Sequence, residues 1–327
     1  MITRRRRVAA LTVVGALVVL PVGVAHATFP GDNGRIAFSQ SAIIGPTGAE
    51  PGDLGAHSQI FTIKPGGGKL KQLTHVPQGH AAASPDWSPD GEKIAYESSQ
   101  GRSGFHIWVM NADGSHQHRV TRGGMYEDLQ PSWSPSGTQL IFSHCPEPLG
   151  FIASCDIARV DADGTDLATL ISEGNWFNVR PVYSPDGNQI AFGSDRDGHQ
   201  SAIWVAGANG NSPTRITDPS LRAFWPDWSP DGNGILFSDH CCLPHSNLWT
   251  VEPNGNNLEQ VTNTPPDLDT AFGGYSPDGQ SIVTLYTKGC DGGPCSHFFT
   301  LAADGGNLNR VETGKKDTFL TDWGPAG

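Results

Sequence analysis

Hydrophobic and polar residues alternate along this chain in short stretches, and the same arrangement of stretches recurs. One alternating stretch occurs in each repeat, at residues 93–98, 139–143, 189–194, 234–238 and 281–286. A second stretch follows it, at residues 106–111, 156–161, 202–207, 247–252 and 297–302. Alternation with a period of two, bounded by Asn-Gly or Asp-Gly turns, predicts β-strands joined in hairpins.

A five-residue motif precedes each first stretch. It reads WSPDG at 87–91 and 228–232, WSPSG at 133–137, YSPDG at 183–187 and 275–279, and in worn form WGPAG at 323–327. Its aromatic residues lie 45 to 50 residues apart, a period typical of a four-stranded propeller blade. Proline presets one corner of a turn and glycine accepts the positive φ that follows. The motif aspartate is therefore predicted to form a turn and not to catalyse.

The two ends of the repeating region complete each other. Residues 29–39 form a second strand with no innermost strand before it. Residues 319–327 form an innermost strand that no further blade strands follow. With strands at 59–64 and 70–74 they predict a sixth blade, which leaves no exposed sheet edge at the join. The predicted fold is an all-β, six-bladed propeller of four-stranded antiparallel blades, one domain over residues 28–327.

The repeats carry a family resemblance. The pattern P-x-W-S-P-D-G-x-x-I-A-F, then I-W-V-M-N-A-D-G and V-T, resembles the TolB-type WD-like propeller repeats over about residues 29–325. The resemblance implies a fold and leaves the function open, because propellers host many activities. TolB itself resembles a small α/β domain followed by a propeller, a domain not expected here. Partner contacts that depend on that domain are therefore not carried over.

The N-terminal segment predicts export. Four arginines at 4–7 precede an apolar run at 8–24, and Ala25-His26-Ala27 is a small-x-small cleavage site, as in a signal peptide spanning residues 1–27. Cleavage would leave a secreted or extracytoplasmic protein with no stable membrane insertion; a retained anchor and the export route stay open. The remaining 17 basic and 33 acidic residues argue against nucleic-acid partners and favour cationic ligands or metal ions. A monomer is expected.

All six cysteines fall in long loops on the face opposite the motif turns. An even number in an exported chain predicts disulfides, with local pairs Cys145–Cys155 and Cys290–Cys295 favoured. The partners of the adjacent Cys241 and Cys242 stay open. A metal site with His240 and His245 is disfavoured, because zinc sites normally separate their cysteines.

The mouth of the central channel is the first candidate binding site. Positions five and six before each motif aromatic residue, with a nearby histidine, supply these candidates: His80, Glu127, Asp128, Asn178, Arg222, Asp269 and Asp317. Their carboxylates could hold Ca²⁺ or another divalent cation, or receive a basic group from a partner. The alternative is a set of solvated loop carboxylates around a water-filled pore.

The long-loop face is the second candidate. It carries a possible recognition patch of these residues: Trp176, Phe177, Phe224, Trp225, His144, His240 and His245. Clustered aromatic side chains mark many recognition surfaces. The aromatic ones could equally be core residues at the blade junctions.

Two functions follow. The sequence has no nucleophile elbow, no H-E-x-x-H and no phosphate-binding glycine loop, which favours a non-enzymatic scaffold presenting disulfide-pinned loops to a protein or cell-envelope polymer. The alternative is a metal-dependent lyase or lactonase acting on a sugar acid or other small substrate at the channel mouth. Some TolB-related propellers resemble uronate lyases that hold a metal with several histidines, whereas the predicted mouth contains only His80.

Overall fold

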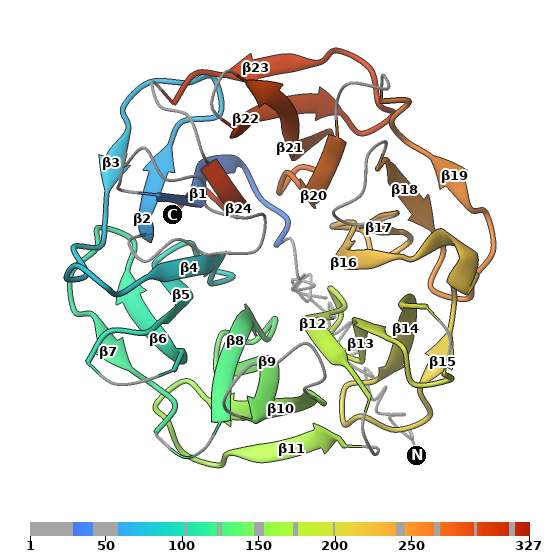
Figure 1. Ribbon diagram of the computed structural model, residues 1–327, viewed down its shortest axis with the longest axis horizontal. Helices are drawn as coiled ribbons and strands as arrows, with labels where there is room; N and C mark the ends of the chain where they lie inside the picture. Colours follow the sequence, from blue (N-terminus) through green and yellow to red (C-terminus); the bar gives the residue numbers. More distant parts are fainter. Residues whose placement is uncertain are drawn as a thin grey trace, which may run out of the picture.

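The computed structural model describes residues 29–41, 58–101, 104–122, 124, 126–146, 154–172, 176–198, 200–239, 246–264, 269–290, 293–313 and 318–327. Within these ranges, 24 β-strands form six four-stranded antiparallel sheets. The sheets stand around a common axis as the blades of a propeller (Figure 1). The predicted six-bladed fold is thus confirmed.

The blades are numbered in chain order, and the first strand named is the innermost. Blade 1 contains β4 (Ala82–Trp87), β5 (Lys93–Ser98), β6 (His106–Asn111) and β7 (His118–Arg119). Blade 2 contains β8 (Tyr126–Trp133), β9 (Gln139–Pro146), β10 (Asp156–Asp161) and β11 (Ala168–Ile171). Blade 3 contains β12 (Asn178–Tyr183), β13 (Gln189–Ser194), β14 (Ala202–Gly207) and β15 (Thr214–Arg215).

The other three blades follow the same order. Blade 4 contains β16 (Phe224–Trp228), β17 (Ile235–Ser238), β18 (Leu248–Val251) and β19 (Glu259–Gln260), and a short 3-10 helix, η1 (Pro219–Leu221), precedes it. Blade 5 contains β20 (Asp269–Tyr275), β21 (Ser281–Cys290), β22 (Gly293–Ala302) and β23 (Asn309–Val311). Blade 6 contains β24 (Thr318–Pro325), β1 (Asn33–Ser41), β2 (Ser58–Ile63) and β3 (Lys71–Gln72). In the described ranges, no helix has the length and apolar character that a membrane span needs.

Blade 6 closes the ring with strands from both ends of the repeats, as predicted. β24 pairs antiparallel with β1, so that Trp323 lies opposite Ile36. On its other side β1 pairs with β2, where Phe38 lies opposite Phe61. Strand pairing therefore continues, with two register shifts between β1 and β24, through the blade that joins the two ends of the repeats.

The Ser-Pro-Asp-Gly segments form the predicted turns. In the first, Asp90 Oδ1 accepts hydrogen bonds from the Ser88 hydroxyl at 2.6 Å and from the Glu92 N–H at 3.0 Å. Gly91 follows with a φ of 68°, which a residue with a Cβ adopts at a cost. Asp186 and Asp231 accept equivalent bonds in their own turns. These aspartates are turn formers.

The hydrophobic core lies between neighbouring blades. At the seam of blades 6 and 1, the motif residue Trp87 belongs to one buried cluster with Tyr96 of its own blade and with Ile60 and Leu73 of blade 6. Burial of apolar surface drives this packing. Because each seam is shared by two blades, we infer that a blade depends on its neighbours for stability.

Substitution of Gly324 tests the packing at the seam of blades 6 and 1. A Cβ at this position would overlap the indole ring of Trp87, which is buried in the seam. We expect Gly324→Ala to lower the free energy of unfolding in urea by about 1–3 kcal/mol, the usual cost of overpacking. The control is Gly66→Ala, where a Cβ meets no atom within 4 Å. Equal midpoints for Gly324→Ala and the control would contradict this account of the seam.

Candidate functional site in the central channel

Each of the first five blades has an irregularity in its innermost strand, three residues before the motif aromatic residue. The residues there have a positive φ between 49° and 57°: Ser84, Gln130, Arg180, Trp225 and Phe272. The pairing with the second strand shifts register at the same place. Such a bulge bends the strand and redirects side chains, and here these five residues border the channel axis.

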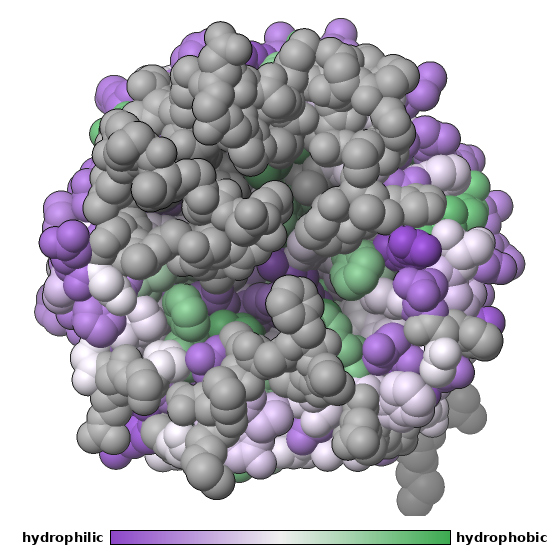
Figure 2. Space-filling model, viewed as in Figure 1, coloured by the Kyte–Doolittle hydropathy of each residue, from purple (hydrophilic) through white to green (hydrophobic). Residues whose placement is uncertain are grey.

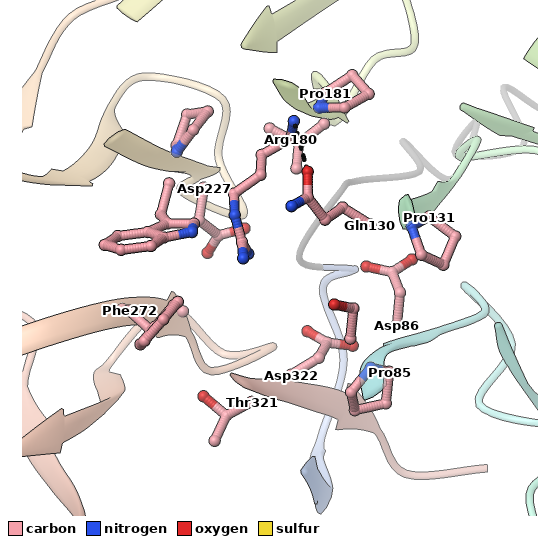
Figure 3. A pocket seen from close by; sticks show the side chains of 16 residues that line it. Pro85, Asp86, Gln130, Pro131, Arg180, Pro181, Asp227, Phe272, Thr321 and Asp322 are labelled. Atoms are coloured by element: carbon pink, nitrogen blue, oxygen red, sulfur yellow. Dashed lines mark hydrogen bonds between the residues drawn. The ribbon is translucent and has the colours of Figure 1, made fainter. Parts of the chain in front are cut away.

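A cavity of about 110 Å³ lies on this axis. All six blades contribute to it with residues one to three positions before the motif aromatic residue: Ser84, Pro85, Asp86, Gln130, Pro131, Arg180, Pro181, Val182, Trp225, Pro226, Asp227, Phe272, Gly273, Gly274, Thr321 and Asp322 (Figure 3). Seen along the axis, hydrophilic residues are visible at the centre of the ring, with hydrophobic residues around them (Figure 2). The cavity is therefore polar and is shared by the whole ring.

Three aspartates in the cavity bind the neighbouring blade. Asp322 Oδ2 accepts the backbone N–H of Trp87 at 2.7 Å, which links blade 6 to blade 1. Asp86 Oδ2 accepts the N–H of Trp133 at 2.8 Å, which links blade 1 to blade 2. Asp227 Oδ2 accepts the N–H of Tyr275 at 2.8 Å, which links blade 4 to blade 5. We call these three residues the clasp aspartates.

The clasp aspartates crowd negative charge at the axis. Burial, with the charges of Asp322 and Asp227, raises the pKa of Asp86 well above its ordinary value, against the opposing N–H of Trp133. Burial also raises the pKa of Asp322 to about 6, although backbone N–H groups oppose this shift. Because like charges destabilise each other in a poorly solvated site, a positive group placed here lowers the energy of the ionised site.

Arg180 brings one positive charge to the same cavity. Its guanidinium carbon lies 5.0 Å from the ring centroid of Trp225 and 5.4 Å from that of Phe272. Both distances suit cation–π attraction. Burial lowers the pKa of Arg180 to about 9, and the charge of Glu97 opposes this shift. The guanidinium is therefore protonated at neutral pH.

Glu97 stands behind the cavity at the seam of blades 1 and 2. It is buried, and its Oε2 accepts the backbone N–H of Gln130 at 2.6 Å. Burial raises its pKa, whereas the Gln130 N–H, the charge of Arg180 and the Ser84 hydroxyl lower it. Glu97 thus fixes the bulge of blade 2 and contributes negative charge near Arg180.

Residues 29–32 cross the end of the channel on the side of the motif turns. The N–H of Gly31 donates to the carbonyl oxygen of Pro277 in the blade 5 turn at 3.3 Å. Phe29 is buried in one cluster with Trp133 of blade 2, on the other side of the ring. Figure 1 shows this segment running from β1 to the centre of the ring. On the side of the motif turns, the described chain therefore crosses the end of the channel.

The predicted mouth residues lie outside the cavity lining. Asp128 is 5% and Asn178 is 1% exposed, and both bond within their blade seams. Asp128 Oδ1 accepts His144 Nδ1 at 2.6 Å, and Asn178 Nδ2 donates to the carbonyl oxygen of Cys155 at 2.9 Å. The two residues are therefore buried in the seams and do not face a shared opening, and their predicted ligand-binding role stays a prediction.

Three further mouth residues are described, and they do not line the cavity either. The ring of His80 bonds the carbonyl oxygen of Ser99 through Nδ1 at 2.7 Å, and Glu127 pairs across the ladder with Cys145. Arg222 is an exposed cap of η1. The backbone of Asp269 begins β20, but its side chain and all of Asp317 lie outside the described part of the chain. Binding by these residues stays a prediction too.

The predicted loop-face patch divides. Trp225 reaches the cavity and packs on Phe272, with ring centroids 4.1 Å apart, and Phe224 lies beside it. Phe177 is 40% exposed and the adjacent Trp176 is half-buried. His144 stacks on Tyr126 at 4.1 Å. His240 and His245 lie outside the described residues.

The cysteine prediction is confirmed at one pair. Cys145 and Cys155 form a disulfide between the end of β9 and the start of β10. Cys290 and Cys295 lie on the hairpin of β21 and β22, where Cys290 pairs with Gly293; their side chains, and all of Cys241 and Cys242, lie outside the described set.

Metal binding has no support in the side chains that the structure describes. Among them, no three His, Cys, Asp or Glu side chains are grouped as a metal site requires. Since Asp269 and Asp317 do not belong to this set, the divalent cation expected at the channel mouth stays a prediction.

Sequence reasoning overlooked the clasp aspartates and Arg180. The column directly before the motif aromatic residue reads Asp at 86, 227 and 322, a repeated charge inside a β-strand that was a usable signal. The column three residues before the aromatic residue varies from blade to blade. Positions that differ between otherwise similar repeats are those at which a propeller can form a single, asymmetric ligand site.

Comparison with known proteins gives the fold. No model of a known protein family matches the chain. An uncharacterised protein of Agrobacterium fabrum is 34% identical over 115 residues, a match that spans 34% of this chain and only 38% of that relative. The structure of TolB from Acinetobacter baumannii aligns with a TM-score of 0.69 and 21% identity over 90% of this chain and 68% of TolB. The chain has a TolB-like propeller fold.

Other solved propellers are similar as well. Hydrazine synthase of Kuenenia stuttgartiensis aligns with a TM-score of 0.73 and 16% identity, over 94% of this chain and 50% of that one. An oligogalacturonate lyase of Vibrio parahaemolyticus aligns with a TM-score of 0.54 and 14% identity, over 77% of this chain and 70% of that one. Since binding proteins and enzymes share this TolB-like fold, the channel has to indicate the function.

The Cys145–Cys155 pairing and its contribution to stability can be tested. It closes a loop with a sequence separation of 10. We expect the double variant Cys145→Ser, Cys155→Ser to lose about 2–4 kcal/mol of unfolding free energy, mainly because the unfolded chain gains entropy. Urea unfolding measures this loss. Unchanged stability, or a peptide map that joins Cys145 to another cysteine, would contradict the pairing.

The raised pKa of Asp322 predicts a pH dependence. Its contribution to stability is complete below the unfolded pKa of 3.8 and is lost as the pH rises through the folded value of about 6. Asp322→Asn keeps an oxygen for the Trp87 N–H but removes the charge. We therefore expect this variant to melt above the wild type at pH 7.5 and level with it at pH 4. Asp166→Asn, at an exposed position, is the control, and a lower midpoint for Asp322→Asn at pH 7.5 would contradict the cost of burying an ionised Asp322.

Proposed function

We propose that this protein is an exported, non-enzymatic binding scaffold that receives a positively charged group of its partner in the central channel. The partner is a protein or a cell-envelope polymer that approaches from the long-loop face. The TolB-like fold supports a binding scaffold in general. The proposal that the channel receives a positively charged group rests on the clasp aspartates.

The charge at the axis is the observation that carries the proposal. Among the described residues, three carboxylates line the cavity, and Arg180 is the one basic residue in its lining. Burial is the main reason why the pKa values of Asp86 and Asp322 are raised, and repulsion by Asp322 and Asp227 adds to the shift of Asp86. A bound cation offsets this repulsion, and it acts in a half-buried site where charge interactions are stronger than in water. The channel is therefore better suited to a cation than to an anion.

Access and location agree with this function. Residues 29–32 cover the other end of the channel, so the partner's group enters between the long loops. The signal-like residues 1–27 support export, and the Cys145–Cys155 disulfide suits an oxidising compartment outside the cytoplasm.

The enzyme alternative keeps one supporting observation, the fold shared with an oligogalacturonate lyase. At 14% identity this likeness concerns the fold alone. Such an enzyme would require a cluster of metal-binding side chains, and the described side chains do not form one. Addition of Mn²⁺ and oligogalacturonate, followed by ultraviolet absorbance for unsaturated products, tests it directly.

Calorimetric titration tests the proposed function. We expect a peptide amide with one lysine between glycines to bind residues 28–327 more tightly than the same peptide with glutamate in place of lysine. At pH 6 binding should release protons, because the cation lowers the raised carboxyl pKa values; buffers of different ionisation enthalpy reveal this release. Affinity should fall at least about tenfold in Asp86→Asn, Asp322→Asn, as for a lost charge-assisted contact.

The control for that variant is Asp166→Asn, which makes the same chemical change at an exposed position. Equal affinity for the lysine and glutamate peptides, or an unaltered affinity in the double variant, would refute the proposal.

A further inference from the structure

Arg180 carries the one guanidinium among the described residues that line the cavity, and the buried Glu97 is its charged neighbour. The backbone N–H of Arg180 is bonded to Gln130 Oε1 at 3.2 Å and to the Ser143 hydroxyl at 3.0 Å. Its guanidinium, in contrast, contacts the rings of Trp225 and Phe272 and interacts with the charge of Glu97, and it donates no hydrogen bond to another described residue. Its N–H donors therefore remain available to whatever enters the cavity.

The guanidinium is also held in place. Two aromatic rings contact it, and those rings pack on each other with centroids 4.1 Å apart. The backbone of Arg180 is fixed at the bulge of blade 3 by its hydrogen bonds into blade 2. A guanidinium with few remaining rotamers loses little entropy on binding and presents a planar fork that matches a carboxylate. Figure 3 shows the side chain extending into the cavity.

The same cavity thus contains both signs of charge. Arg180 lines it from blade 3, whereas Asp86 and Asp322 line it from blades 1 and 6. We propose that the ligand group is an α-amino-carboxylate zwitterion, whose ammonium contacts the clasp aspartates while its carboxylate contacts Arg180. This inference rests on the proposed function and deepens it, because it adds an anionic subsite next to the cationic one.

Charge and size both select such a group. An anion alone would meet three carboxylates, and a cation alone would leave the donors of Arg180 unpaired in a poorly solvated site, which is costly. The volume of about 110 Å³ is below that of a cavity of about 150 Å³ that holds benzene. The site therefore suits a group smaller than benzene, such as glycine or the end group of a longer chain.

Two sources offer this chemistry, a free amino acid and a diamino-acid side chain that ends in an α-amino-carboxylate on a cell-envelope peptide. Glycine stands for the first source. Nε-acetyl-lysine stands for the second, because its far end is blocked and its α-amino-carboxylate is free. Tighter binding of Nε-acetyl-lysine would assign a chain-borne ligand, and tighter binding of glycine a free one; both support the zwitterion site.

The test is a calorimetric titration of residues 28–327 with glycine, glycinamide, acetate and Nε-acetyl-lysine. We expect the zwitterions to bind at least about tenfold more tightly than glycinamide, and acetate not to bind. Arg180→Gln should weaken the zwitterions by about 10- to 100-fold, the effect of losing a charge-assisted hydrogen bond, and should not weaken glycinamide, because it removes a positive charge that repels the ammonium. Arg180→Lys should restore part of the loss, since it keeps the charge without the fork.

Arg310→Gln is the matched control, because Arg310 lies on the outermost strand of blade 5 and its ion pair with Glu312 is exposed. Thermal melting of each variant checks that the ring is intact. Equal binding of glycine and glycinamide, both unaffected by Arg180→Gln, would overturn this inference and leave the cation site standing. Failure of every ammonium probe to bind would overturn the zwitterion site and the proposed function together.

Discussion

A carboxylate that accepts the backbone N–H of the next blade is the interaction on which the centre of this molecule depends. Asp322 forms it with Trp87 across the seam where the two ends of the ring meet. A carboxylate suits this task because it accepts a strong, charge-assisted bond. It also places a charge on the axis. Assembly of the ring and the electrostatics of the channel therefore have the same cause.

That shared cause explains why the site is acidic and also organised. Each clasp aspartate is held by its backbone partner, so it cannot turn away from its neighbours to relieve repulsion. The raised pKa of Asp86 reflects this constraint. Arg180, pinned by Trp225 and Phe272, adds an ordered donor on another side of the same space. In the proposed function, a ligand of suitable charge offsets the repulsion between these carboxylates.

Much of the fold was predictable because turns and strands have local causes. Proline, aspartate and glycine in the motif specify the turn at Ser88–Gly91, and the complementary chain ends predict the closure by β24 and β1. The site was harder to predict, because counting from the aromatic residue selects Asp128 and Asn178, five residues before it, whereas the bulge places Arg180, three residues before it, at the cavity. Those two residues bond within the seams. Register shifts of this kind arise from the packing of neighbouring strands.

Carboxyl-carbon NMR of ¹³C-labelled aspartate gives the most direct test of the central claim, that the clasp aspartates are buried carboxylates on the channel axis that bind a cationic group. The resonance absent from Asp322→Asn identifies that residue in the wild-type spectrum. The account predicts that it titrates near pH 6, and that a bound zwitterion or lysine peptide moves this titration to lower pH. A titration below pH 4, unchanged by either ligand, would contradict the account.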